Sequence, residues 1–255
     1  MSTGADVRRG GPARRTAAGS ILLGALALLL GACSALPEMP PPVPQDIVPS
    51  VAAPSLSAEG SAQLSPDGFD AVQRMAVRIR NVGCDTLSTG SGFALDEHTL
   101  VTNRHVVADS STLQVSTYDG RDLDVSAAST AALADLAVVR TADPLPSFPR
   151  LADDDPAPGD DVTVVGYPAG GRLTVTAGRV IGTTTDPLHE NLGEVLVTDA
   201  PVEPGSSGSA ALDEAGDVIG VVYAKTTDGR SLLVPQSTLR EMLGDTAAFT
   251  ELTPC

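Results

Sequence analysis

From residue 76 to residue 235 the chain consists of short runs that are rich in β-branched residues or alternate in polarity. Such runs predict strands, and clusters such as Asp153-Asp154-Asp155-Pro156 and Asp228-Gly229 predict the turns between them. Six predicted strands are followed by six more, over residues 76–82, 91–96, 99–104, 113–117, 122–127 and 136–141, and then 162–166, 173–184, 194–199, 209–213, 218–226 and 231–235. This spacing favours barrels or a sandwich and does not distinguish between them.

Helical patterns occur only at the two ends of this region. Residues 65–78 predict a short opening helix, and the apolar spacing within 236–243 predicts a closing one. The predicted fold class is therefore all-β with a short C-terminal helix.

The N-terminal segment has the pattern of an export signal. Four arginines precede an uninterrupted apolar run at 21–30, which ends directly before Gly31, Ala32 and Cys33. Ten residues rise only about 15 Å as a helix, roughly half the thickness of a bilayer's hydrocarbon core. We therefore expect residues 1–32 to be a signal peptide that is removed.

The end of that segment, Leu30-Gly31-Ala32-Cys33, resembles a bacterial lipobox. The resemblance implies that Cys33 is lipidated and anchors the protein to the extracytoplasmic face of the cell membrane. An ordinary secreted protein is the alternative. Residues 33–64 are rich in Pro, Ala and Ser without apolar periodicity and predict a disordered tether. Residues 65–255 then form the folded domain.

The cysteines indicate the redox compartment of the protein, and the net charge limits the kinds of partner that it can bind. Of three cysteines, a lipidated Cys33 leaves Cys84 and Cys255, which we expect to form a disulfide in an oxidising compartment, with two free thiols as the alternative. The net charge of −16 argues against nucleic acid and against a polybasic membrane contact. The lipid is then the only obvious membrane anchor.

Three separate positions carry chemistry. His105 ends a predicted strand, Asp135 begins an otherwise apolar one, and Ser207 lies in the turn Pro204-Gly205-Ser206-Ser207-Gly208-Ser209. A carboxylate at the start of a buried strand needs a partner, and a histidine or backbone amides can supply it. In acyl transfer, the backbone N–H groups of Gly205 and Ser207 would stabilise the oxyanion. Taken singly, each position also fits a strand end, a solvated turn or a flexible loop.

Together the three positions resemble the HtrA-type trypsin-like serine proteases in order and spacing, over residues 77–243. The stretches that match are Gly90-Ser91-Gly92-Phe93, Thr102-Asn103-Arg104-His105-Val106-Val107, Asp135-Leu136-Ala137-Val138, and Thr198-Asp199-Ala200 leading into Gly205-Ser206-Ser207-Gly208. The pairing of Cys84 with Cys255 also resembles the layout of membrane-anchored actinobacterial members.

The resemblance implies two perpendicular six-stranded antiparallel β-barrels, with a catalytic triad at their junction. His105 would be the general base, Asp135 would fix its tautomer, and Ser207 would form an acyl-enzyme with protein or peptide substrates. No metal or other cofactor is implied.

Only 48 residues follow Ser207, so we expect no PDZ domain and a monomer or small oligomer. The family commonly has Gly and Pro where this chain has Ser209 and Ala210. This difference affects the shape of the turn and not a reacting side chain.

Rival interpretations are weaker. An α/β-hydrolase needs a histidine after the serine, and none follows His189. A serine-lysine dyad would use Lys225 without a supporting motif. His98 and His189 lack metal-ligand spacing, and the aspartates at 153–155 and 160–161 fit solvated turns better than calcium sites. A catalytically silent binding protein with the protease fold stays open as the alternative function.

The expected primary specificity pocket lies between Pro201–Pro204 and Val221–Ala224. The apolar character of these segments favours small or aliphatic side chains over Arg or Lys, and cleavage of a peptide library after basic residues would overturn this prediction.

Overall fold

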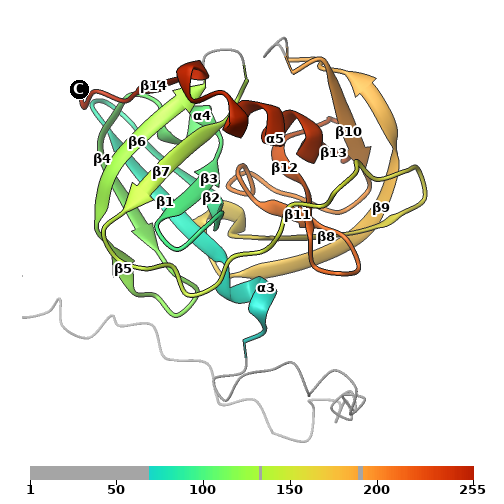
Figure 1. Cartoon of the computed structure of the whole chain (residues 1–255), viewed down its shortest axis with the longest axis horizontal. Coiled ribbons are helices and arrows are strands. Elements are labelled where there is room, and N and C mark those ends of the chain that lie inside the picture. The colour runs from blue at the N-terminus through green and yellow to red at the C-terminus, as the bar shows by residue number, and fades with distance from the viewer. Residues whose placement is uncertain (1–68, 132–133, 189–191) are drawn as a thin grey trace, which may run out of the picture. The chain divides into compact units, whose positions relative to one another are not determined.

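The structure, a computed structural model, describes residues 69–131, 134–188 and 192–255 (Figure 1). The predicted signal peptide, Cys33, the predicted tether and His189 lie outside these residues. Within the described ranges, no helix has the length and apolar character needed to span a membrane.

The N-terminal half of the described chain forms an eight-stranded sheet in the order β14-β6-β7-β3-β2-β1-β4-β5. Two one-turn helices, α3 (Ala71–Arg74) and α4 (Arg104–Val107), precede β1 and follow β3. The strands are β1 (Ala76–Gly83), β2 (Leu87–Ala94), β3 (Thr99–Thr102), β4 (Ser110–Ser116), β5 (Asp122–Leu123), β6 (Val125–Ala131), β7 (Ala137–Thr141) and β14 (Phe249–Glu251).

The C-terminal half forms a closed antiparallel barrel in the order β10-β13-β12-β11-β8-β9. Two 3-10 turns, η3 (Pro168–Gly170) and η4 (Thr246–Ala248), and the helix α5 (Gln236–Gly244) complete it. The strands are β8 (Asp161–Gly166), β9 (Thr174–Thr185), β10 (Glu194–Thr198), β11 (Ala210–Leu212), β12 (Val218–Lys225) and β13 (Ser231–Pro235). The trypsin-like all-β class and the closing helix were therefore predicted correctly.

The first sheet has eight strands in an open order, two more than the six predicted for this half. The run predicted as one strand at 122–127 is broken at Asp124, whose N–H donates to Asp143 Oδ2 at 2.8 Å instead of joining the ladder with β4. The two pieces pair with different neighbours, β5 with β4 and β6 with β7. The eighth strand, β14, pairs with β6 from a distant part of the chain.

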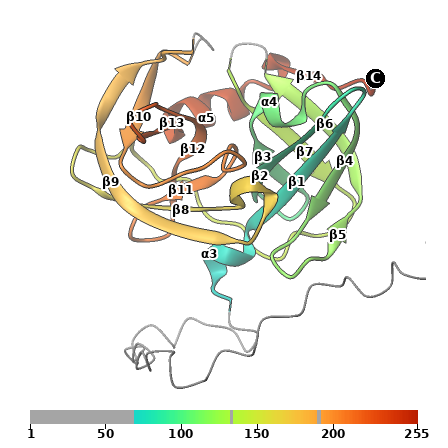
Figure 2. The same cartoon turned by 180° about the vertical axis from the view of Figure 1, so that it is seen from behind.

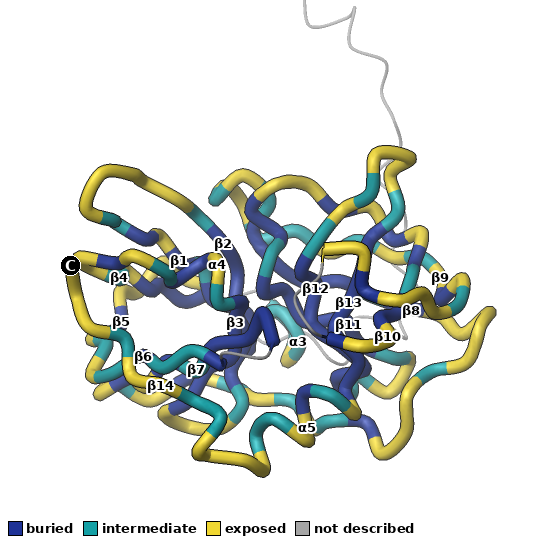
Figure 3. Tube along the Cα trace, turned by 90° about the horizontal axis from the view of Figure 1, so that it is seen from above, coloured by how far each residue is buried: buried dark blue, intermediate teal, exposed yellow. Residues whose placement is uncertain are grey.

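The described residues contain three apolar cores, one of which holds the two halves together. The first lies within the eight-stranded sheet and includes Ile79 and Leu100, and the second lies within the barrel and includes Leu196 and Leu233. The third combines residues of both sheets, such as Phe93 and Leu212, with Leu239 of α5. Figure 3 shows the buried residues concentrated where the two sheets meet. Alternation along each strand sends one face to its own core, while residues at the junction of the sheets pack against the other half.

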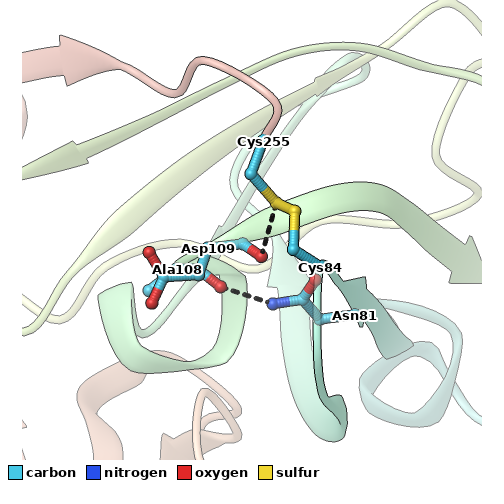
Figure 4. Close-up of a disulfide and its surroundings, with 5 residues drawn as sticks. All are labelled: Asn81, Cys84, Ala108, Asp109 and Cys255. Carbon is cyan, nitrogen blue, oxygen red and sulfur yellow. Dashed lines mark hydrogen bonds between the residues drawn. A yellow bond between two sulfur atoms is a disulfide. The ribbon is translucent and has the colours of Figure 1, made fainter.

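A disulfide fixes the C-terminal end of the chain to the first sheet (Figure 4), and Figure 2 shows that this end lies beside the sheet. It joins Cys84, in the turn between β1 and β2, to Cys255, across a sequence separation of 171 residues. The N–H of Cys255 also donates to the carbonyl of Ser110 at 3.1 Å. The segment that contains β14 is thus held to the sheet by its ladder with β6 and by a covalent bond at its end.

We predict that the double substitution Cys84→Ser, Cys255→Ser lowers the free energy of unfolding by about 2–4 kcal/mol, because an unfolded chain without the crosslink gains conformational entropy. Urea denaturation under non-reducing conditions measures the loss. The wild-type protein in excess dithiothreitol should behave as the double variant does. Equal midpoints for the variant and the oxidised wild type would contradict the prediction.

Candidate active site

His105 is placed by the short helix that follows β3. The helix α4 begins after Asn103, and its residues Val106 and Val107 are buried, so the helix is anchored by its apolar side. The His105 side chain, 48% exposed, stays accessible at the surface. The strand thus brings the histidine to the site, and the buried valines fix its direction.

Asp135, just before β7, is bonded to His105 through both carboxylate oxygens. The His105 backbone N–H donates to Oδ1 at 3.0 Å, and its ring Nδ1 lies 2.5 Å from Oδ2. Asp135 is only 2% exposed, and Asn103 Nδ2 donates to its backbone carbonyl at 2.8 Å. A buried carboxylate favours the hydrogen on Nδ1, which leaves Nε2 of His105 free to accept a proton.

Ser207 lies in a tight turn before β11 that requires glycine on both sides. Gly205 and Gly208 have φ values of +95° and +86°. At Gly208 space is also missing, since a Cβ there would lie 2.0 Å from the carbonyl oxygen of Ser91 and 2.4 Å from Thr102 Oγ1. The turn therefore packs directly against the strands that carry His105.

Ser91 of β2 connects the two halves of the site. Its N–H donates to the carbonyl of Ser207 at 2.8 Å, and its own carbonyl accepts from Thr102 Oγ1 at 2.7 Å. Its hydroxyl donates to the carbonyl of Gly205 and accepts from the N–H of Tyr167, each at 2.8 Å. One fully buried residue thus bonds to the serine turn, to the strand before His105 and to the end of β8.

Two backbone donors of the serine turn have no partner among the described residues. The N–H groups of Ser206, Gly208 and Ser209 all donate within the fold, to Glu203, Val222 and Ser206 respectively. The N–H groups of Gly205 and Ser207 make no hydrogen bond with any residue that the structure describes. They are the same two groups that the sequence predicted as oxyanion donors, and unpaired donors side by side can bind a developing negative charge.

The hydroxyl of Ser207 forms no hydrogen bond with His105 among the described residues. The serine is half-buried, whereas the histidine is more exposed. In unliganded active sites such bonds are often long or poorly aligned and tighten only with substrate. The structure therefore joins two of the three predicted residues directly, and the third through Ser91 and Thr102.

Ser209 and Ala210, the departures from the common turn sequence, are accommodated by the facing strand. A Cβ on Gly166 would lie 1.8 Å from Ser209 Oγ, so the absence of a side chain in β8 makes room for the extra hydroxyl. Ser209 is fully buried, and its hydroxyl has no partner among the described residues. The turn keeps its shape at the cost of one unsatisfied buried group.

The sequence did not identify the supporting roles of Ser91, Thr102 and Tyr167. The motif Gly90-Ser91-Gly92 marked the strand, but nothing in it revealed which group the serine bonds. Tyr167 is 4% exposed, and burial raises its pKa to about 12 while the nearby Arg78 opposes this rise. Its phenol is therefore neutral at neutral pH.

The structure forms a cavity of about 120 Å³ against the serine turn, lined by Pro201, Val202, Glu203 and Ser206. Its other wall comes from β8 and β9, and none of Val221–Ala224 lines it. The cavity is thus a different one from the primary pocket predicted from the sequence. Val222 instead packs with Val202 in the core of the barrel.

The remaining candidates have structural roles. His98 is an exposed residue of the turn before β3, with its N–H bonded to Asp96, and Lys225 pairs with Glu203 at 2.9 Å and not with the serine. In the ranges that the structure covers, no group of histidine, cysteine and acidic side chains is arranged to hold a metal ion.

Comparisons with known proteins agree with this geometry. A family model described as a trypsin-like peptidase domain matches residues 90–221. The chain is 34% identical over 165 residues to the mitochondrial serine protease HTRA2 of Bos taurus, covering 62% of this chain and 36% of that protein. A probable periplasmic serine endoprotease, DegP-like, of Brucella suis is 33% identical over 166 residues, covering 62% of this chain and 32% of its own length. The chain thus spans about a third of the length of these relatives.

Solved structures show the same similarity in three dimensions. The active form of the Rv3671c protease from M. tuberculosis superimposes with a TM-score of 0.62 at 27% identity, covering 72% of this chain and 85% of that one. A serine endoprotease from Yersinia pestis gives a TM-score of 0.59 at 27% identity, over 68% and 64% of the two chains.

The substitution Gly208→Ala tests the packing of the serine turn. A Cβ would clash with the Ser91 carbonyl, so we predict a loss of several kcal/mol in the free energy of unfolding. The control is Gly229→Ala, where φ is +88° and no atom lies within 4 Å of the added Cβ. It should cost only the backbone strain of about 1–2 kcal/mol. Urea denaturation that gave equal losses for both variants would show that the turn does not pack as described.

Proposed function

Because the chain belongs to the trypsin-like peptidase family, we propose that it is a serine endopeptidase with His105, Asp135 and Ser207 as its catalytic triad. The observation that carries the proposal is the pairing of His105 with a buried Asp135 at 2.5 Å, near a turn in which two N–H groups have no partner among the described residues. The relatives named above are serine proteases, and their similarity supports the same class of reaction.

The proposed reaction proceeds in two halves. Nε2 of His105 takes the proton of the Ser207 hydroxyl as its oxygen attacks the scissile carbonyl, and the N–H groups of Gly205 and Ser207 bind the oxyanion. The C–N bond then breaks, His105 gives the proton to the leaving amine, and an acyl-enzyme forms on Ser207. Water, deprotonated by His105, attacks the ester and releases the second product with Ser207 restored.

Asp135 orients and stabilises His105 without gaining or losing a proton. Its two bonds to His105 hold the ring in the tautomer that leaves Nε2 free, and its charge stabilises the imidazolium formed in each half-reaction. Donation from Asn103 to its carbonyl keeps the aspartate in place. The reaction needs no metal or other cofactor, since the oxyanion and the imidazolium are both stabilised by groups of the chain.

We further propose that the protein acts on protein or peptide substrates outside the cytoplasm, held to the membrane by lipid on Cys33. What supports this is the charged and apolar leader before a lipobox-like sequence, and the disulfide, which suits an oxidising compartment. A monomer or small oligomer is the expected assembly, which sedimentation of the purified protein would test.

Covalent labelling tests the triad directly. A fluorophosphonate should add once to the wild-type protein, on Ser207, and Ser207→Ala should remove the adduct. His105→Ala and Asp135→Asn should slow labelling roughly 1,000-fold or more, because each removes a part of the system that activates the nucleophile. His98→Ala, at an exposed histidine outside the site, is the matched control and should react at the wild-type rate. Peptide mapping by mass spectrometry identifies the labelled residue.

An unlabelled wild-type protein would contradict the proposed hydrolase. The alternative would then be a binding protein that retains the protease fold, which the open Ser207–His105 contact would fit.

The substitution Cys33→Ser tests the membrane anchor. Without the thiol no lipid can be attached, so in a bacterial host with a lipoprotein pathway the protein should move from the membrane fraction to the soluble exported fraction. Intact mass of the wild-type protein should show the added acyl chains. Wild type and Cys33→Ser distributed alike would favour an ordinary secreted protein.

A further inference from the structure

A groove of about 740 Å³ lies on the first sheet beside the serine turn, and two arginines of β1 line it together with β2, β4 and η3. The register places Arg78 opposite Ser91 and Ser116 on the neighbouring strands, and Arg80 opposite Thr89 and Gln114. Directly opposed residues share one face of a sheet. Both arginines therefore lie on the same face as Ser91, the residue that bonds to the serine turn.

The turn η3 connects the groove to the serine turn of the candidate active site. The N–H of Ala169 in η3 donates to the carbonyl of Pro204 at 2.6 Å, next to the oxyanion donor Gly205. On the other side of η3, a Cβ on Gly170 would lie 2.5 Å from Thr89 Oγ1. The turn η3 thus fills the space between β2 and the serine turn, and both Ala169 and Gly170 line the groove.

The geometry of the reaction decides which part of a substrate lies here. His105 gives its proton to the leaving amine, so the segment after the cleaved bond departs on the side of the sheet that carries His105. That sheet also contains β1, β2 and β4. The oxyanion donors and Pro201–Pro204 belong to the other half, which faces the acyl segment.

The two arginines of the groove form no ion pair with any residue that the structure describes. Four cations form ion pairs with carboxylates in the described part of the chain, namely Arg150, Arg179, Lys225 and Arg230. Arg78 and Arg80 form none there, and Arg78 bonds only to the hydroxyl of Ser116, at 3.3 Å. Asp122, the acidic residue in the lining, is exposed and pairs with neither. Arg140 and Arg172 also form no ion pair among the described residues, but only Arg78 and Arg80 lie together in a groove.

The spacing of the two arginines suits carboxylates. Residues two apart on a strand lie about 7 Å from each other on one face, so the two cations repel each other until an anion comes between them or beside each. A guanidinium binds a carboxylate through two parallel hydrogen bonds, which gives direction as well as attraction. An extended peptide along the groove presents alternate side chains to such a face.

From this arrangement we infer that Arg78 and Arg80 select substrates with acidic side chains in the segment after the cleaved bond. The inference rests on the proposed endopeptidase function and adds the class of its substrate. Attraction at this partly exposed site should raise kcat/KM about tenfold for glutamate over glutamine. The preference should weaken as salt is added, because the Debye length falls to about 10 Å at 0.1 M.

Digestion of a peptide library by the full-length protein, with cut sites identified by mass spectrometry, tests the selection. Asp and Glu should be enriched after the cleaved bond, and the enrichment should disappear in the double variant Arg78→Gln, Arg80→Gln. In Arg78→Glu, Arg80→Glu it should reverse toward Lys and Arg. Arg140→Gln is the control, because it removes a positive charge from an exposed arginine of β7, away from the groove, and should keep the acidic preference. Absence of acidic enrichment in the wild type would overturn the inference.

A binding measurement separates this inference from the proposed function. In the Ser207→Ala background, fluorescence anisotropy compares a labelled peptide Ala-Ala-Val-Ala-Ser-Glu-Glu with its Gln-Gln counterpart. The Glu-Glu peptide should bind about tenfold more tightly, and Arg78→Gln, Arg80→Gln should remove the difference. Selective binding without fluorophosphonate labelling of the wild type would refute the hydrolase but support the acidic-peptide groove. Labelling with equal affinity for both peptides would keep the hydrolase and refute the groove.

Discussion

The hydrogen bonds of Ser91 hold the candidate active site together. The residue contacts the serine turn through its N–H and its hydroxyl, the strand before His105 through its carbonyl, and the end of β8 as a hydroxyl acceptor. Since Ser91 is fully buried, water cannot reach its polar groups, and these bonds satisfy them instead. Leaving a buried polar group unpaired costs about 1–3 kcal/mol, so loss of the Ser91 hydroxyl would penalise both Tyr167 N–H and the Gly205 carbonyl.

The close approach of the two halves restricts which residues can lie next to Ser91. Gly208 is required because the Ser91 carbonyl lies where its Cβ would be, and Gly166 is required because Ser209 fills the equivalent space. Ser209 and Gly166 are 43 positions apart in the sequence, and the serine fits at its position only because the facing residue has no side chain. The N–H groups of Gly205 and Ser207 have no partner among the described residues, whereas the other N–H groups of the turn are bonded. The bonds of the neighbouring groups hold the turn in one shape, which fixes the direction of the two donors.

Charge is distributed unevenly over the molecule. Acidic residues are spread over the surface turns, while Arg78 and Arg80 stand unpaired, among the described residues, on a face next to the serine turn. A strongly acidic protein repels acidic peptides at long range, but screening limits that repulsion to about one Debye length. Within the groove, attraction to the two arginines outweighs this screened repulsion. A protein with a negative net charge can therefore prefer acidic substrates.

The sequence by itself determined the all-β class and the closing helix, and it predicted His105, Asp135 and Ser207 as the reactive residues. Period-two runs with β-branched residues encode strands locally, and His105, Asp135 and Ser207 lie in motifs whose residue types are required by the chemistry. It did not determine that Asp124 breaks a strand or that β14 joins β6, because both depend on partners far along the chain. Only the tertiary structure decided the roles of Ser91, Gly166 and the two arginines. Each of these acts through a neighbour from another strand, and strand pairing and the contact between the two sheets are not encoded in any local run of residues.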